Sequence, residues 1–96
     1  MKVTAHQPHV WFLLKDGDAY YLDVNCNVSA CSFDIVIKLN QEEFREYHGL
    51  GLVYIEYLAA RVNYWSQEYW PRNCADLAAP INEAEQDYMK NGAHDS

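Results

Sequence analysis

The sequence predicts an α+β fold: a small antiparallel sheet of three to four strands, two consecutive helices packed on one face, and a short C-terminal helix. Two observations predict the sheet. Residues 33–39 place an apolar side chain at every second position, and an Asp16-Gly17 pair separates two β-prone segments, which is a strong hairpin signal. The helices follow from apolar residues at helical spacing after residue 40. Because the strands precede the helices, a doubly wound parallel sheet is disfavoured.

The first predicted hairpin joins residues 9–14 to residues 19–25. A type I′ turn at Asp16-Gly17 requires positive φ at both central positions, which aspartate and glycine tolerate. The first strand is apolar on both faces, so we expect it to be central in the sheet or covered on both sides. One face carries Val10, Phe12 and Leu14, and the other carries Trp11 and Leu13.

The remaining strands are predicted from composition and alternation. Residues 25–32 have the composition of a loop, and residues 33–39 then form the clearest strand. Residues 2–5 are a candidate fourth strand. The chain ends, residues 1–5 and 93–96, are where fraying is expected. No composition shift marks a boundary, so residues 1–96 are predicted to form a single domain.

Two consecutive helices are predicted over residues 41–48 and 51–66. Asn40 is a suitable N-cap residue for the first helix, and acidic residues follow it in the first turn. Gly49-Leu50-Gly51 separates the helices, since a continuous helix through two glycines would cost roughly 2 kcal/mol relative to alanines. The apolar stripe of the second helix consists of Leu52, Ile55, Leu58, Ala59, Val62 and Trp65.

A short amphipathic helix is predicted near the C-terminus. Residues 71–79 are expected to be irregular, and Pro80 then suits the first turn of the helix. Gly92 would lie past its end. The apolar edge of this helix would consist of Ile81, Ala84 and Tyr88.

Composition and charge limit the classes of partner. Half of the 96 residues are apolar, which suffices for one ordered core. The formal net charge of −7 disfavours direct nucleic-acid binding, because acidic surfaces repel phosphate backbones, and it suits a basic protein partner. No apolar segment resembles a signal peptide or could span a bilayer. Three cysteines without an export signal predict reduced thiols, a cytoplasmic location and no membrane association.

Two histidines and two cysteines supply the ligand types of a tetrahedral zinc site. His6 and His9 are three residues apart, and Cys26 and Cys31 are five apart. The histidines precede the cysteines, however, and the cysteine spacing exceeds that of common zinc motifs. We therefore predict three free thiols and neither a bound metal nor another cofactor.

No catalytic motif is recognisable, and we predict a protein without enzymatic activity. Asp23 and Asp34 could face each other across neighbouring strands, but both positions fit the solvent side of a half-buried sheet. A general acid would need a desolvated pocket. A thiol nucleophile would need one of the cysteines beside His48, and no local motif supports that arrangement.

Tyrosine and tryptophan gather in and just after the predicted helix 51–66. These side chains combine a large apolar body with a polar tip and are common anchors of protein interfaces. Two interpretations stay open: the rings form a contact patch for another protein, or they lean over the sheet edge and complete the core. The same patch could be the contact of a symmetric dimer. The predicted partner-binding residues are Tyr54, Tyr57, Arg61, Tyr64, Tyr69 and Trp70.

These observations lead to three functional hypotheses. The first is a small acidic cytoplasmic protein-binding module, such as an inhibitor, an immunity-type protein or an adaptor. The second is a small-molecule-binding domain or minor enzyme with a pocket between the sheet and helix 51–66. The third is a self-associating homodimer. The pocket of the second hypothesis would be lined by Trp11, Tyr21, Tyr57 and Tyr64.

Overall fold

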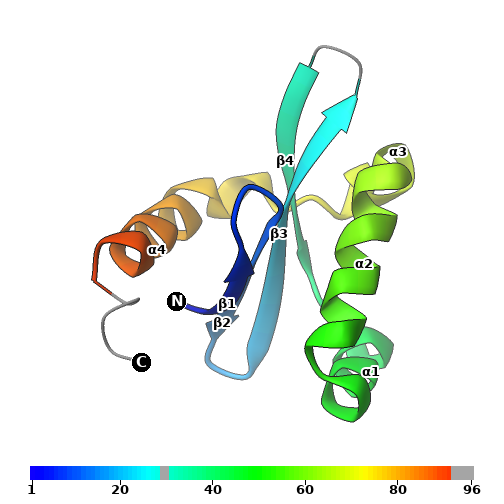
Figure 1. The fold of residues 1–96 in the computed structure, drawn as a ribbon, viewed down its shortest axis with the longest axis horizontal. Coiled ribbons are helices and arrows are strands. Elements are labelled where there is room, and N and C mark those ends of the chain that lie inside the picture. Colours follow the sequence, from blue (N-terminus) through cyan, green and yellow to red (C-terminus); the bar gives the residue numbers. More distant parts are fainter. Residues whose placement is uncertain (29–30, 92–96) are drawn as a thin grey trace.

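The computed structural model describes residues 1–28 and 31–91 and confirms the predicted α+β fold. Figure 1 shows one four-stranded antiparallel sheet with helices packed around it. The strands are hydrogen-bonded in their sequence order, so β1 and β4 form the edges. The strands are β1 (Lys2–Gln7), β2 (Trp11–Asp16), β3 (Ala19–Val28) and β4 (Cys31–Lys38).

The β2–β3 hairpin forms where the sequence predicts it, but the predicted type I′ turn at Asp16-Gly17 is wrong, because the two turn residues are Gly17 and Asp18 and only the glycine has positive φ. Asp16 pairs with Ala19, and Gly17 adopts a φ of 63°, the left-handed conformation that favours glycine. β2 is hydrogen-bonded to β1 on one side and to β3 on the other. The central position predicted for this strand from its two apolar faces is therefore confirmed.

The loop predicted over residues 25–32 is wrong for residues 25–28 and 31–32, because β3 and β4 stay paired as far as Val28 and Cys31, while residues 29 and 30 lie outside the described residues. Polar side chains of this stretch bond across the two strands, with Ser32 Oγ donating to Asn25 Oδ1 at 2.9 Å. β1 provides the fourth strand and pairs with β2. The predictions for Gly92 and for residues 93–96 lie outside the described residues.

Helical segments make up most of the described chain after β4. Asn40 caps the first helix, since its side chain accepts from the Glu43 amide at 2.8 Å and its own amide donates to the Glu43 carboxylate at 2.9 Å. Gly51 ends that helix with a φ of 69°, so a break separates the two helices as predicted, but the helix continues two residues beyond the predicted end, through Gly49 to Leu50. The segments are α1 (Gln41–Leu50), α2 (Leu52–Tyr64), α3 (Ser66–Tyr69), η1 (Trp70–Arg72), η2 (Ala75–Leu77) and α4 (Ala78–Lys90).

The larger core lies between α2 and one face of the sheet, and α1 packs beside it. Trp65 was predicted to join this core, but its side chain is 46% exposed, because α2 ends at Tyr64 and Trp65 leaves the helical conformation. Short helical turns occupy most of the stretch 71–79, which the sequence predicted to be irregular. The buried residues of this core are Trp11, Leu13, Leu22, Val24, Cys26, Ile35, Ile37, Leu39, Ile55, Leu58, Ala59 and Val62.

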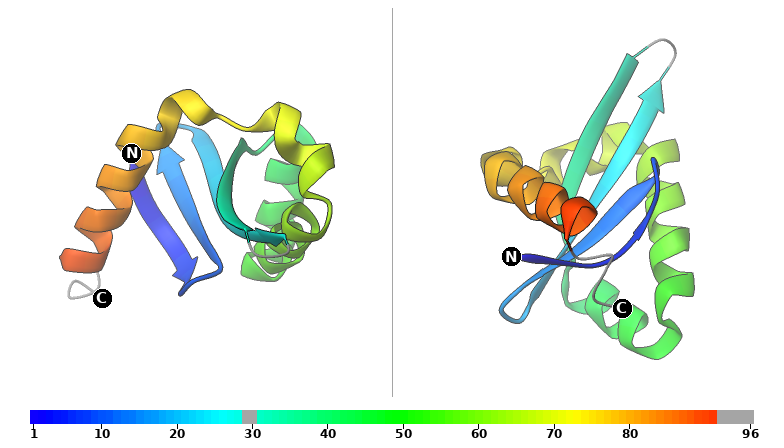
Figure 2. Two further views of the ribbon diagram at one scale, coloured as in Figure 1. Left: turned by 90° about the horizontal axis from the view of Figure 1, so that it is seen from above. Right: turned by 60° about the vertical axis from the view of Figure 1, so that its left-hand side comes forward.

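The chain then passes around the β4 edge to the other face of the sheet. The Val36 amide donates to Asn73 Oδ1 at 2.9 Å, and the Val36 carbonyl accepts from the Cys74 amide at 2.7 Å. These bonds satisfy edge groups that would otherwise be open to another strand. Figure 2 shows the resulting three layers, with α4 on one side of the sheet and α1 and α2 on the other.

A smaller core forms under α4, where Leu14, Val36 and Ile81 are buried. Phe12 packs against this smaller core, whereas Ile37 belongs to the larger one. The reason is strand alternation: Phe12 and Leu14 point to the face opposite that of Leu13. The sheet is consequently covered on both faces.

Candidate functional site

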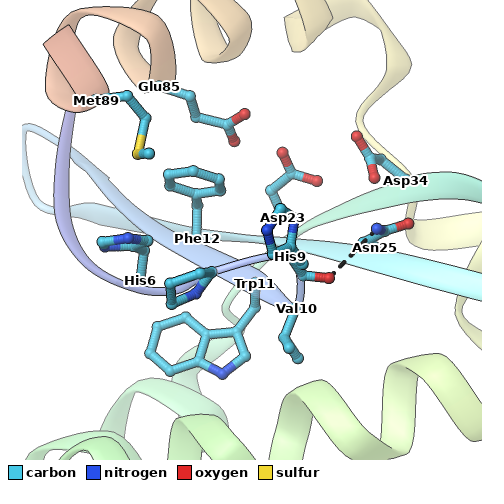
Figure 3. A pocket seen from close by; sticks show the side chains of 11 residues that line it. His6, His9, Val10, Trp11, Phe12, Asp23, Asn25, Asp34, Glu85 and Met89 are labelled. Atoms are coloured by element: carbon cyan, nitrogen blue, oxygen red, sulfur yellow. Dashed lines mark hydrogen bonds between the residues drawn. The ribbon is translucent and has the colours of Figure 1, made fainter.

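A cavity of about 260 Å³ opens on the α4 side of the sheet, between the β1–β2 hairpin, the two following strands and α4. Figure 3 shows that three carboxyl groups from three different elements point toward it: Asp23 from β3, Asp34 from β4 and Glu85 from α4. Phe12 and Met89 supply apolar wall. The cavity therefore combines concentrated acidic groups with an apolar side.

Asp23 is the most buried of the three acids, with 5% of its surface exposed. It lies in the middle of β3, paired with Phe12 of β2 and Val36 of β4. Its carboxyl group is hydrogen-bonded to that of Glu85. Such a bond needs one shared proton, because two carboxylates offer acceptors only. Within the described residues, no donor other than this shared proton reaches Asp23 Oδ1 or Glu85 Oε2.

Burial dominates the electrostatics of this pair. Burial raises the pKa of Asp23 above its usual range, and the hydrogen bond from Glu85 acts in the opposite direction. Burial, together with the bond and charge of Asp23, raises the pKa of Glu85 to about 9. Partial burial and the charge of Asp23 also raise the pKa of Asp34. Near neutral pH, Glu85 is therefore the protonated member of the pair.

Neighbouring polar groups do not neutralise the acids. A ring nitrogen of His6 lies 3.2 Å from the Tyr88 hydroxyl, and the ring stacks on Phe12 with 5.3 Å between centroids. Asn25 Nδ2 donates to the His9 carbonyl at 3.3 Å. Across residues 1–28 and 31–91, neither lysine nor arginine forms an ion pair with the three acids of the cavity.

Replacing Glu85 with glutamine is expected to remove most of the pH dependence that this pair gives to stability. The pKa of Glu85 is about 9 in the folded chain and near 4.5 when unfolded. The folded chain therefore binds more protons between these values, and the free energy of unfolding falls as pH rises across that window. Glutamine cannot ionise and can donate to Asp23, so Glu85→Gln should be more stable than wild type by about 1–3 kcal/mol at about pH 8.5.

Urea unfolding followed by circular dichroism at about pH 5 and about pH 8.5 would measure this difference. The matched control is Glu83→Gln, because Glu83 is an exposed acid on the same helix. Equal pH dependence for wild type and Glu85→Gln would show that Glu85 ionises normally in the folded chain.

The sequence missed this site because Asp23 was assigned to the solvent side of the sheet. That assignment is wrong: α4 covers this face, and only Asp34 is exposed. Two signals pointed to the site. The apolar Phe12 and Leu14 indicated a second covered face, and Glu85 lies four residues after Ile81, on the inward side of its helix.

The structure does not bring together the four residues that were considered as zinc ligands. Cys26 is buried in the larger core, with its Sγ 3.9 Å from the Val62 carbonyl, whereas His6 lies on the α4 side and Cys31 is exposed. Within the described residues, no three histidine, cysteine or carboxylate side chains are grouped to hold a metal ion. Burial, with smaller contributions from nearby acids, raises the pKa of Cys26 to about 11, so this thiol stays protonated at neutral pH.

The pocket expected between the sheet and helix 51–66 also does not assemble. Trp11 fills the larger core, Tyr21 packs on the α4 side, and Tyr57 and Tyr64 are 56% and 76% exposed. The four predicted lining residues therefore point in three different directions.

The predicted partner-binding residues divide into two groups. Tyr54 and Tyr69 are half-buried and pack against the larger core. Arg61 donates to the hydroxyls of Tyr57 and Tyr69, both at 3.3 Å. Trp70 is 55% exposed and makes an edge contact with Phe33, with 5.9 Å between ring centroids.

Tyr57, Arg61 and Tyr64 form the second group, which belongs to a largely apolar surface on the side of α2 that faces away from the sheet. Val53 is 69% exposed there, and a helical repeat of 3.6 residues places Ala60 and Tyr64 on the same line. Ile55 and Val62, nearly opposite on the helix, are fully buried. We call this surface the outer α2 face; its exposed residues are Val53, Glu56, Tyr57, Ala60, Arg61 and Tyr64.

Comparison with known proteins found no matching family model, no matching curated protein and no matching solved structure. Among the described residues, no helix has the length and apolar character needed to cross a membrane. Function is therefore inferred from the geometry of the acidic cavity and of the outer α2 face.

Proposed function

We propose that this chain is a protein-binding module that associates with a second copy of itself through the outer α2 face. The exposure of Val53, Tyr57 and Tyr64, each more than half exposed, carries the proposal. A surface helix of a globular domain normally has one apolar stripe and one polar face. α2 is apolar on both sides, which is the pattern of a helix covered by the core on one side and by a partner on the other.

The order of residues along this face is self-complementary. In a symmetric antiparallel pair of helices, each residue lies opposite one at the same distance on the other side of the two-fold axis. We place that axis at the middle of α2, between Leu58 and Ala59. The facing pairs across the axis are then Val53 with Tyr64, Glu56 with Arg61, and Tyr57 with Ala60.

Each facing pair is chemically favourable. Ala60 leaves room for the ring of Tyr57, and Glu56 meets a residue of opposite charge. Glu56 and Arg61 are five residues apart, so they are not neighbours within one helix, where pairs form at three or four. The guanidinium has five N–H donors, and its bonds to two tyrosine hydroxyls leave others for a carboxylate of the second copy.

Charge reversal tests both the association and its register. Glu56→Arg should place two arginines opposite each other, and Arg61→Glu should place two glutamates there. Each should weaken dimerisation by at least about tenfold, because like charges across an interface cost several kcal/mol. The double variant restores opposite charges, so its dimerisation should return toward that of wild type. Sedimentation velocity over a range of concentrations would measure all four proteins.

Matched variants separate association from folding. Glu83→Arg makes the same charge change at an exposed site on α4 and should leave dimerisation unchanged. Tyr57→Ala and Tyr64→Ala should weaken association while changing the free energy of unfolding by only about 0.5 kcal/mol.

Three results would contradict the proposal: a wild type that stays monomeric, a double variant that does not recover, or tyrosine variants that lose 3 kcal/mol or more, about the cost of emptying a core site. If a basic protein were the partner instead, association with that protein should weaken as salt rises.

A further inference from the structure

We propose that the outer edge of β4, at Ser32 and Asp34, binds an extended segment of another protein in which an apolar side chain stands between two basic ones. Figure 1 shows these ends of β3 and β4 extending beyond the helices that cover the sheet. The edge is separate from the outer α2 face, so the proposal does not depend on self-association. Open backbone groups, an adjacent apolar pocket and the local charge support it.

The backbone groups of Ser32 and Asp34 point away from β3. In an antiparallel pair, alternate residues direct their N–H and C=O groups toward the partner strand and away from it. Both groups of Val36 point outward, where they bond to Asn73 and Cys74. Asp34 and Ser32 follow Val36 at steps of two residues, and no hydrogen bond joins their outward groups to another residue of 1–28 or 31–91. The edge is therefore closed at Val36 and open to an added strand at Asp34 and Ser32.

An apolar pocket of about 260 Å³ lies beside this open edge. It is lined by Phe33 of β4, Ser66 and Gln67 of α3, and Trp70 of η1. Trp70 touches the Phe33 ring, yet 55% of its surface still faces solvent. The volume lies below that of drug-sized pockets and suits one apolar side chain. Because Phe33 packs on the α2 side of the sheet, that side chain would belong to the α2 face of the added strand.

Charge selects the residues on either side of that apolar side chain. Successive side chains of a strand point to opposite faces, so the two flanking residues would lie on the α4 face, where Asp34 is exposed. Residues 19–37 include two acids and no lysine, arginine or histidine. Lysine or arginine therefore suits both flanking positions, and a second copy of this chain, with its net charge of −7, is a poorer occupant.

Amide NMR titration with the peptide acetyl-Thr-Lys-Leu-Lys-Thr-amide would test the site at residue resolution. We expect shift changes concentrated at Ser32, Phe33 and Asp34 and at the indole N–H of Trp70. Replacing the peptide leucine with serine should weaken binding at least about tenfold, because the pocket loses its apolar occupant. Methylating the backbone nitrogens of both lysines should weaken it by a similar factor, because the donors to the β4 edge are lost. Replacing both lysines with glutamates should also weaken binding, because their charge matches that of Asp34.

Variants of the protein test the same site from the other side. Proline is tolerated in a strand where the N–H group faces solvent, so Ser32→Pro should keep the β3–β4 pairing but lose one outward donor. It should weaken binding by about fivefold, the effect of one hydrogen bond, whereas Ser32→Ala keeps the donor and should bind like wild type. Trp70→Ala should weaken binding at least about tenfold. Trp65→Ala is the matched control, because Trp65 is also exposed but does not line the pocket.

The peptide series decides the question even if Ser32→Pro is unstable. Absence of shift changes at about 5 mM peptide would overturn the proposal, as would equal binding of the leucine and serine peptides. Equal binding of the methylated and unmethylated peptides would also overturn it, because the contact would then be one of side-chain charge alone.

Discussion

Replacing Ile37 with aspartate is expected to unfold the domain. The side chain of Ile37 is fully buried in the larger core, where its strand partner is Leu22 and Ile55 of α2 belongs to the same cluster. An unpaired charge at this position costs several kcal/mol, against a total stability of roughly 5–14 kcal/mol for a chain of this length. Thermal melting followed by circular dichroism would show loss of the cooperative transition.

The neighbouring residue provides the control for this prediction. Lys38 follows Ile37 in β4 but is exposed. Lys38→Asp also introduces an acid, yet it should change the free energy of unfolding by only about 0.5 kcal/mol. If Ile37→Asp melted like wild type, the register of β4 described here would be wrong.

The second large effect is expected at Arg72, which joins the crossing segment to α1 and β4. Its guanidinium contacts both carboxylate oxygens of Glu43, at 2.6 and 2.9 Å, and donates to the Lys38 carbonyl at 2.9 Å. The Glu43 side chain is only 10% exposed. Arg72→Ala would leave that carboxylate buried without its cation. We expect a loss of about 3 kcal/mol, the lower end for a broken buried pair, because a third of the Arg72 side chain reaches solvent.

The pH dependence of this variant has a definite sign. Burial alone would raise the pKa of Glu43, but its bonds to Arg72 and the Asn40 amide hold it below its usual range. Glu43 therefore contributes stability above the unfolded value near 4.5, and this contribution is lost as pH falls. Arg72→Ala should reduce that acid sensitivity.

Urea unfolding at about pH 7 and about pH 4 would measure both effects, with exposed Arg45→Ala as the control. Equal stability of Arg72→Ala and Arg45→Ala would show that the Glu43 pair contributes little. The opposite signs expected for Glu43 and Glu85 keep the two acids distinguishable in one pH series.

Local sequence rules predicted the elements whose cause is local. The β2–β3 hairpin, the Asn40 cap and the Gly51 break depend on neighbouring residues, and each was identified, although the turn of the hairpin lies one residue later than predicted, at Gly17 and Asp18. The extension of β3 to Val28 and of β4 back to Cys31 was missed because polar residues there are stabilised by cross-strand bonds. The prediction that Trp65 is buried was wrong because the end of α2 depends on the position of the segment that follows it, which local sequence does not specify.

The candidate site was less predictable for a different reason. Asp23, Asp34 and Glu85 meet only because the chain passes around the β4 edge and lays α4 on the second face. Nothing local to these acids specifies that crossing. Asn73, which bonds to the β4 edge, has no distinctive context in the sequence. The aromatic residues of α2, in contrast, were found by composition, although composition could not divide Tyr54 and Tyr69 from the exposed rings.

The helices on the two faces of the sheet bury unequal numbers of side chains against it. α4 contributes one buried side chain, Ile81, whereas α2 contributes four. Regions with few buried apolar contacts open at lower free energy than the whole domain unfolds. We therefore expect α4 to separate from the sheet as a local unfolding unit while the rest of the chain stays folded. Its release would expose Asp23 and Glu85 to water, where both ionise, so alkaline conditions would favour this partly open state and faster amide exchange in α4.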